Sequence, residues 1–403
     1  MTASESRRIP PGIWALGFVS MLMDISSEMI HALLPIYMVT VLGTSTLAVG
    51  IIEGIAEATA SIVKVFSGAL SDWLGKRKLL AAVGYGLGAL TKLIFPLAGA
   101  LGWLVAARFI DRVGKGIRGA PRDALVADLA PPELRGASFG LRQTLDTIGA
   151  FTGPLLAIGL MWLLADDFRA VFWIAVVPAV LSVAVLVLAV RDPATEAVRR
   201  PARFPLHRRD LARLGTRYWW VVGVAAVMTL ARFSEAFLLL RFQQFDVPVF
   251  LLPFVLVVMG IAYSLSAYPA GAVSDRLDRV TLLQVGLALL VLADLTLAWG
   301  PNLLVAGIGI ALWGLHMGFS QGLLAAMIAD TAAADLRGTA FGVFNLVTGV
   351  ALLVASVVAG ALWDTVGSSA TFLAGAIFSA LALAGLVIIK LRTDHLSVST
   401  QAR

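Results

Sequence analysis

The chain contains no cysteine and none of the sequence signatures of a soluble catalytic domain. Without cysteine, its 403 residues form no disulfide, no thiolate metal site and no thiol nucleophile. The phosphate-binding pattern GxxxxGK[ST] and the metalloprotease pattern HExxH are also missing. These absences exclude ATP-driven transport by this chain alone. We expect it to be neither an enzyme nor a cofactor-binding protein, with no resident metal.

Charge is scarce and apolar residues dominate. Only 14% of the residues are charged, 59% are hydrophobic, and the mean hydropathy is +0.90. At roughly 1.5 Å per residue, an apolar segment of about 20 residues crosses a hydrocarbon core of about 30 Å. The sequence therefore predicts an all-α polytopic membrane protein with twelve transmembrane helices, at 12–40, 46–72, 78–99, 101–125, 136–164, 168–190, 217–243, 248–273, 280–299, 302–329, 338–362 and 369–391.

The basic residues fall on alternate connections between these spans. By the positive-inside rule, the connections that carry them face the cytoplasm. We therefore expect a multi-pass protein of the bacterial cytoplasmic (inner) membrane with both termini inside. Basic loops facing an anionic lipid leaflet also explain the net charge of +6 without nucleic acid as a partner.

An internal repeat divides the chain. GALSD at 68–72 recurs as GAVSD at 271–275, and ADLAPPELRGASFG at 127–140 recurs as ADTAAADLRGTAFG at 329–342. The sequence predicts two six-helix halves, 1–190 and 217–403, joined by a basic cytoplasmic linker at 191–216. Repeats of this kind are typical of secondary transporters. Because one chain holds both halves, we expect it to function as a monomer.

The loop after the second span carries a specific motif. GALSDWLGKRKLL at 68–80 resembles the loop signature of the major facilitator superfamily, and GAVSDRLDR at 271–279 is a weaker copy. The resemblance covers essentially the whole chain and implies the superfamily fold. It also implies a cytoplasmic gating loop made by Gly68, Asp72, Gly75, Lys76, Arg77, Asp275 and Arg276.

Two further segments resemble signatures of proton-coupled members. RVGKGIRGA at 112–120 is similar to the fourth-span signature, which implies that Arg112 is linked to proton movement. GAFTGP at 149–154 is similar to the fifth-span antiporter signature, with Gly149, Gly153 and Pro154 matching. The resemblance implies export by antiport.

Charged residues recur at helical spacing within the first half. Such stripes avoid lipid, so they meet one another or line an aqueous cavity. Carboxylates and arginines converge near the bilayer midplane, which predicts that protons are exchanged there, with Asp24, Glu57 or Asp146 as the carrier. The residues that we expect to take part in coupling and transport are Asp24, Glu28, Glu53, Glu57, Asp111, Arg112, Arg142 and Asp146.

The second half is poorer in charge. We expect a weaker contribution to the substrate cavity from Arg232, Glu235, His316, Gln321 and Asn345. Isolated histidines such as His31 and His316 are more often helix–helix hydrogen-bonding groups than ligands.

The resulting hypothesis is a secondary transporter that exports a small organic compound in exchange for protons. Its expected partners are that small molecule, protons and the lipid bilayer. Three alternatives stay open: proton-coupled uptake, export of a divalent metal ion through Asp24, Glu28 and His31, and a receptor or scaffold that transports nothing.

Overall fold

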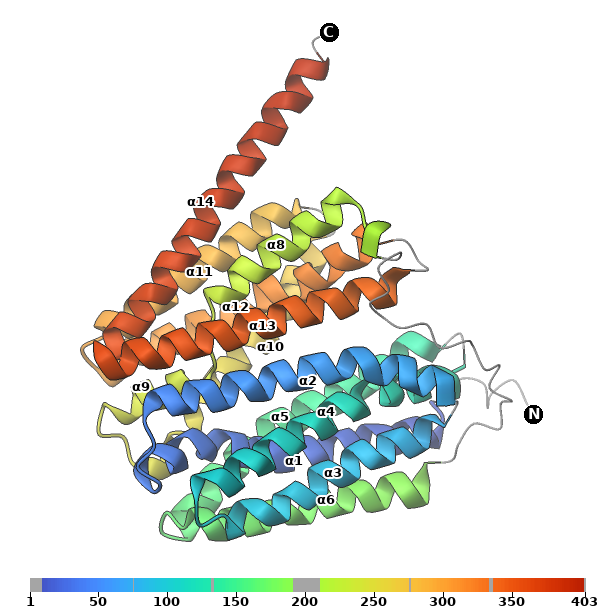
Figure 1. The fold of residues 1–403 in the computed structure, drawn as a ribbon, viewed down its shortest axis with the longest axis vertical. Helices are drawn as coiled ribbons and strands as arrows, with labels where there is room; N and C mark the ends of the chain where they lie inside the picture. The colour runs from blue at the N-terminus through green and yellow to red at the C-terminus, as the bar shows by residue number, and fades with distance from the viewer. Residues whose placement is uncertain are drawn as a thin grey trace. The chain divides into compact units, whose positions relative to one another are not determined.

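The computed structural model describes residues 9–74, 76–131, 134–190, 211–274, 277–332 and 336–401, and within them the chain is helical and has no strand (Figure 1). The helices of the first half are α1 (Pro11–Thr40), α2 (Thr46–Leu74), α3 (Arg77–Leu97), α4 (Leu101–Leu129), α5 (Arg135–Leu163) and α6 (Phe168–Ala189). Those of the second half are α8 (Thr216–Leu230), α9 (Ala236–Gln243), the short 3₁₀ helix η3 (Val249–Leu251), α10 (Phe254–Ser274), α11 (Arg279–Trp299), α12 (Leu303–Thr331), α13 (Arg337–Thr365) and α14 (Ser368–Gln401).

Ten of the described helices are long and apolar enough to cross a membrane. Two of the twelve predicted spans are outside this set for different reasons. α4 has the length of a span, but it holds the charge-rich segment 108–128. The seventh span was predicted as one helix over 217–243 and is instead divided into α8 and α9. The all-α polytopic fold is confirmed, and the single seventh helix is a correction.

The division of the seventh span lies at Ala231–Glu235. The Ser234 hydroxyl accepts a hydrogen bond from the Ala236 amide, and the Ser234 amide donates to the Ser356 hydroxyl of α13 at 3.2 Å. Serine readily satisfies backbone groups in this way, which competes with a continuous helix. Inside a membrane, irregular backbone is tolerated where neighbouring helices satisfy it.

The described residues form two compact units. The first is drawn from 1–44, 55–207 and 248–254, and the second from 45–54, 208–247 and 255–403. Compared with the expected six-helix halves, the first turns of α2 group with the second unit, while η3 groups with the first. The predicted linker lies outside the described residues over 191–210.

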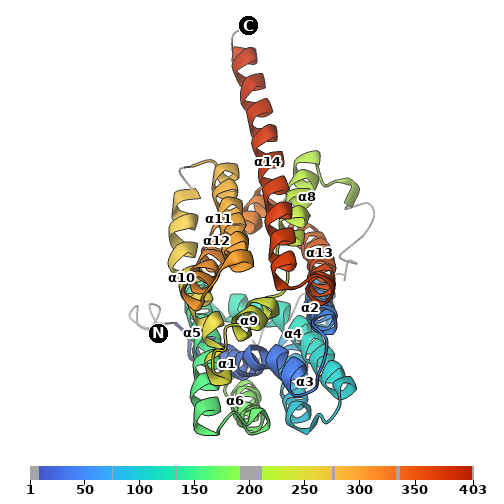
Figure 2. The same ribbon diagram turned by 90° about the vertical axis from the view of Figure 1, so that its left-hand side faces the viewer.

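Equivalent helices pack alike within each unit. In the first, α1 packs on α5 and α6, while α3 packs on α4 and α6. In the second, α11 packs on α12 and α14, and Figure 2 shows α14 running between α11 and α8. From α3 to α5, helix ends recur at a constant offset of 202 residues, as in Arg77–Leu97 and Arg279–Trp299 (279 − 77 = 202; 299 − 97 = 202).

Candidate functional site

Helix α4 carries the charge-rich segment 108–128 and packs closely against α3 in the first unit. A Cβ atom on Gly84 would lie 2.7 Å from the Gly114 carbonyl oxygen, and one on Gly114 would lie 2.7 Å from the Gly84 carbonyl oxygen. Only glycine permits such an approach of two backbones. Side chains further along α3 and α4 can therefore reach across the contact.

An ion pair with both partners buried joins these two helices. Lys92 Nζ lies 2.9 Å from Asp111 Oδ1, and both side chains are at most 3% exposed. Asp111 was predicted, whereas Lys92 was missed. It is the one charge in the interior of α3, and that isolation within an apolar run is the signal that could have identified it.

Arg112 extends this pair toward α1 and α2. Its Nη1 lies 3.1 Å from Glu57 Oε1, and its Nε lies 4.0 Å from Asp111 Oδ2. His31 Nδ1 lies 3.3 Å from Arg108 Nη2 and 3.5 Å from Arg112 Nη2, so it accepts from guanidinium groups. We call this set the Arg112 cluster: His31, Glu57, Lys92, Arg108, Asp111 and Arg112.

A second group of charges joins α4 to α5 and α1. Asp146 pairs with Arg142 one turn before it and lies 3.7 Å from Arg122 Nη1. Arg122 also donates to Ser20 of α1 at 2.9 Å, and its Nε lies 3.1 Å from Asp123 Oδ1. We call this set the Arg142 cluster: Asp24, Arg118, Arg122, Asp123, Arg142 and Asp146.

Asp24 is the most loosely held carboxylate of the Arg142 cluster. The distance from its Oδ1 to Arg118 Nη2 is 3.9 Å, and its side chain is 27% exposed. The guanidinium of Arg118 stacks instead over the ring of Tyr85, with 4.8 Å between guanidinium carbon and ring centroid. The negative charge of Asp146 acts on Asp24 from α5.

The glycines of the fifth-span motif lie where α5 touches α1. A Cβ on Gly149 would lie 2.6 Å from the Met21 carbonyl oxygen and 3.1 Å from Asp24 Cβ. One on Gly153 would lie 2.6 Å from Glu28 Cβ. Pro154 follows inside the same helix. The motif therefore brings α5 against the face of α1 that carries Asp24 and Glu28.

Glu53 is also buried, one turn before Glu57 on α2, but it groups with the second unit. In that unit, Arg232 and Glu235 lie in the break between α8 and α9. His316 is buried and bonds through Nδ1 to the Gly286 carbonyl oxygen at 2.8 Å, so it joins α12 to α11. Gln321 is exposed and Asn345 is half-buried.

The gating-loop motif is partly described. Arg77, at the start of α3, pairs with Asp128 of α4, and Arg279, at the start of α11, pairs with Asp330 of α12. Both pairs obey the 202-residue offset. Gly68 lies on α2 beside Ala120, and Lys76 precedes α3. The side chain of Asp72 and all of Gly75, Asp275 and Arg276 lie outside the described part.

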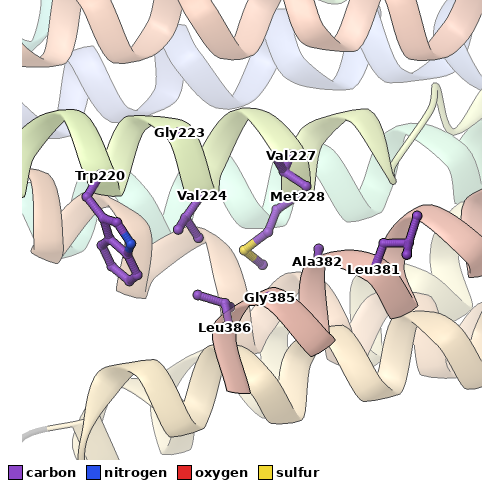
Figure 3. A pocket seen from close by; sticks show the side chains of 9 residues that line it. All are labelled: Trp220, Gly223, Val224, Val227, Met228, Leu381, Ala382, Gly385 and Leu386. Atoms are coloured by element: carbon purple, nitrogen blue, oxygen red, sulfur yellow. The ribbon is translucent and has the colours of Figure 1, made fainter. Parts of the chain in front are cut away.

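An apolar pocket of about 420 Å³ lies between α8 and α14 (Figure 3). Trp220, Val224 and Met228 line it from α8, and Leu381 and Leu386 from α14. None of the predicted site residues lines this pocket. In the part of the chain that the structure describes, no three histidine, aspartate or glutamate side chains converge as metal ligands would.

Comparison with known proteins identifies the family. The family model of the Major Facilitator Superfamily (MFS) matches residues 16–355 and 236–402. The uncharacterised MFS-type transporter MJ1317 of Methanocaldococcus jannaschii is 31% identical over 393 residues, which are 96% of both chains. The multidrug resistance protein MdtH of Cronobacter sakazakii is 30% identical over 208 residues, 50% of this chain and 49% of its own.

Among solved structures, the nucleoside transporter NupG superposes with a TM-score of 0.76 at 14% identity, covering 94% of this chain and 99% of its own. At 14% identity, this likeness shows the fold alone. The family model and the relative that is 31% identical over 96% of the chain show the family. This chain therefore belongs to the Major Facilitator Superfamily and is a membrane transporter, not an enzyme.

Proposed function

We propose that the chain exports a small organic compound from the cytoplasm in exchange for protons, with Asp24 as the carboxylate that carries the proton. The observation that carries this proposal is the loose pairing of Asp24 within a membrane-embedded charge cluster. Glu57 and Asp146 are held more firmly, by Arg112 and by Arg122 with Arg142. Separating a carboxylate from a distant arginine costs less free energy than breaking a close ion pair. Asp24 is therefore the best candidate for a carboxylate that binds a proton in place of its arginine partner.

The surroundings of Asp24 support this role. Asp24 and Asp146 repel each other as long as both are ionised, and Arg118 and Arg122 offset that repulsion. A proton on Asp24 removes the repulsion and releases Arg118 toward other partners. Binding of a proton is thereby linked to a rearrangement between α1, α4 and α5.

Lys115 connects the two clusters. Its side chain is exposed although it lies in the middle of α4, and its charge acts on both Asp24 and Glu57. An ammonium group at membrane depth is costly in contact with lipid, so this side of α4 faces water. Water beside Asp24 and Glu57 is the route by which protons and a polar solute would arrive.

The direction of transport is inferred from two resemblances. GAFTGP resembles an antiporter signature, and its glycines pack on the segment of α1 that holds Asp24. MdtH, named a multidrug resistance protein, is similar to about half of this chain. Export of an organic compound across the cytoplasmic membrane agrees with both.

Everted membrane vesicles test this proposal. A proton gradient, acid inside, is imposed on vesicles containing the full chain, and uptake is measured for a panel of organic cations, organic anions and divalent metal ions. We expect at least one organic compound to accumulate with the unaltered protein and not with Asp24→Asn. The matched control is Asp167→Asn, which alters the carboxylate that caps α6 outside both clusters.

Gradient-driven accumulation that survives in Asp24→Asn would overturn the role of Asp24. Accumulation of divalent metal ions alone would replace the organic substrate by a metal ion.

A further inference from the structure

The second unit contains a further buried carboxylate, Asp294, to which no function has been assigned above. Asp294 is fully buried on α11, and neither of its side-chain oxygens has a hydrogen-bond partner among the described residues. An ionised carboxylate in such a place costs many kcal/mol of lost hydration unless it is paired.

The internal repeat relates Asp294 to the buried ion pair of the first unit. The offset of 202 residues places Asp294 at the position of Lys92 (92 + 202 = 294) and Trp313 at the position of Asp111 (111 + 202 = 313). The first unit has a lysine and an aspartate there, 2.9 Å apart. The second unit has an acid and an indole, so its carboxyl group has no basic partner at the equivalent place.

Aromatic rings and a glycine surround this carboxyl group. A Cβ on Gly375 of α14 would lie 2.5 Å from Asp294 Oδ2 and 3.3 Å from the ring of Phe233. The Phe233 ring packs on Trp313 and Phe372, with centroid distances of 5.2 and 5.4 Å. The Asp294 carboxyl group therefore lies between α11 and α14 in apolar surroundings, with aromatic side chains beside it.

Among the described residues, no charged group forms an ion pair or hydrogen bond with the Asp294 carboxyl group. On α11 the nearest charged residue is Arg279, fifteen residues away, at the start of the helix and paired with Asp330 of α12. His316 of α12 is bonded to Gly286, and Arg241 of α9 donates to the carbonyl oxygens of Leu297 and Gly300. Arg232 and Glu235 are close to Phe233 in the sequence, but neither forms a hydrogen bond with Asp294. Between Ser368 and Ile388, α14 contains no charged residue.

We propose that Asp294 is a proton-binding site of the second unit, which holds a proton in the conformation described here and releases it to water when the contact between α11 and α14 opens. Binding forms one O–H bond on the carboxylate, and release breaks that bond and returns the proton to water. The bound state follows from burial and the missing partner. The release step, as part of a transport cycle, rests on the proton coupling proposed above.

Infrared spectroscopy of the purified full chain tests the site without knowledge of the substrate. Protein labelled with ¹³C at the aspartate carboxyl carbon is compared with unlabelled protein at neutral pH. We expect a carbonyl stretching band of a protonated carboxylic acid that shifts with the label, is lost in Asp294→Asn, and persists in Asp330→Asn. Transfer to D₂O is expected to shift the band, because opening of the contact admits water.

Three results would overturn the proposal. One is the absence of a label-sensitive acid band from the unaltered protein, a measurement that needs no variant to fold. Another is an acid band that has the same intensity in Asp294→Asn as in the unaltered protein. The third is a band that never exchanges in D₂O, which would make Asp294 a permanently neutral structural acid.

The infrared and transport experiments together distinguish failure of the proposed Asp294 site from failure of the proposed function. An exchanging acid band in a protein that moves no protons across vesicles would retain the site and contradict proton-coupled export. Proton-coupled transport without the band would retain the export function and contradict the site.

Discussion

At the scale of single residues, the first unit is held together by charges that pair between helices. Arg112 joins α4 to α2, and Lys92 joins α3 to α4. In a buried pair, the loss of one partner leaves the other charge uncompensated, which costs more than replacing both by apolar groups. This asymmetry distinguishes a fixed structural pair from a carboxylate such as Asp24, which has only a distant partner.

Lys92 and Asp111 are a pair in which both partners are buried, so they test this asymmetry. We expect Lys92→Met to lower the free energy of unfolding by about 3–5 kcal/mol, because Asp111 then lies buried without its closest cation. The double variant Lys92→Met, Asp111→Leu is expected to recover most of the loss. Thermal unfolding in detergent measures both.

The control is Lys78→Met, at the half-buried start of the same helix, where Lys78 donates to the Val187 carbonyl oxygen. A Lys92→Met protein as stable as this control would show that the pair contributes little.

At the scale of helices, glycine spacing decides which faces meet. We expect Gly149→Val to reduce stability by about 1–3 kcal/mol and to impair transport, because its side chain would have to displace α5 from α1 beside Asp24. Gly159→Val, ten residues further along α5 at a position with nothing within 4 Å, is expected to be neutral. Unfolding and vesicle transport compare the two, and equal behaviour would contradict the close contact.

Helix α11 begins with a charged cap outside the membrane. Asp278 accepts hydrogen bonds from the amides of Val280 and Thr281 and pairs with Lys390 at 2.9 Å. Burial raises the pKa of Asp278, but the hydrogen bonds from Lys390, Val280 and Thr281 outweigh it, and the pKa lies below its ordinary value. The ionised carboxylate therefore stabilises the folded protein.

Because the folded-state pKa is lowered, this stabilisation is complete above the ordinary aspartate pKa and is lost as the pH falls through the folded-state value. Asp278→Ala is expected to cost about 1 kcal/mol at neutral pH and progressively less in acid. Asn302→Ala, which removes the neutral cap of α12, serves as the control with a pH-independent loss. Thermal unfolding at several pH values compares them, and a constant loss for Asp278→Ala would contradict the charged cap.

At the scale of the whole chain, much of the fold could be predicted from sequence because lipid imposes a strict pattern. The length of the apolar segments predicted most of the helices, and the internal repeat predicted that the helices form two equivalent sets. The break at Ala231–Glu235 was missed, since ARFSE contains neither proline nor glycine and the serine contacts that satisfy its backbone arise only in the folded chain.

The candidate site was predictable in part for a similar reason. Helical spacing brought the carboxylates of α1, α2 and α5 to common faces, but it gave no information on which cation each would meet. The partners Lys92 and Arg118 depend on how closely α3 approaches α4, a distance set by Gly84 and Gly114. The full burial of Asp294 and its missing hydrogen-bond partner could not be predicted, because they depend on how α11 packs against α14.

The central claim is that substrate and protons cross the membrane in opposite directions. The most direct measurement places the full chain in proteoliposomes that contain a pH-sensitive dye and adds outside each compound that accumulates in everted vesicles. The account predicts that entry of the compound drives protons out, and that Asp24→Asn abolishes this movement. Protons that enter together with the compound, or a compound that crosses without any proton movement, would contradict it.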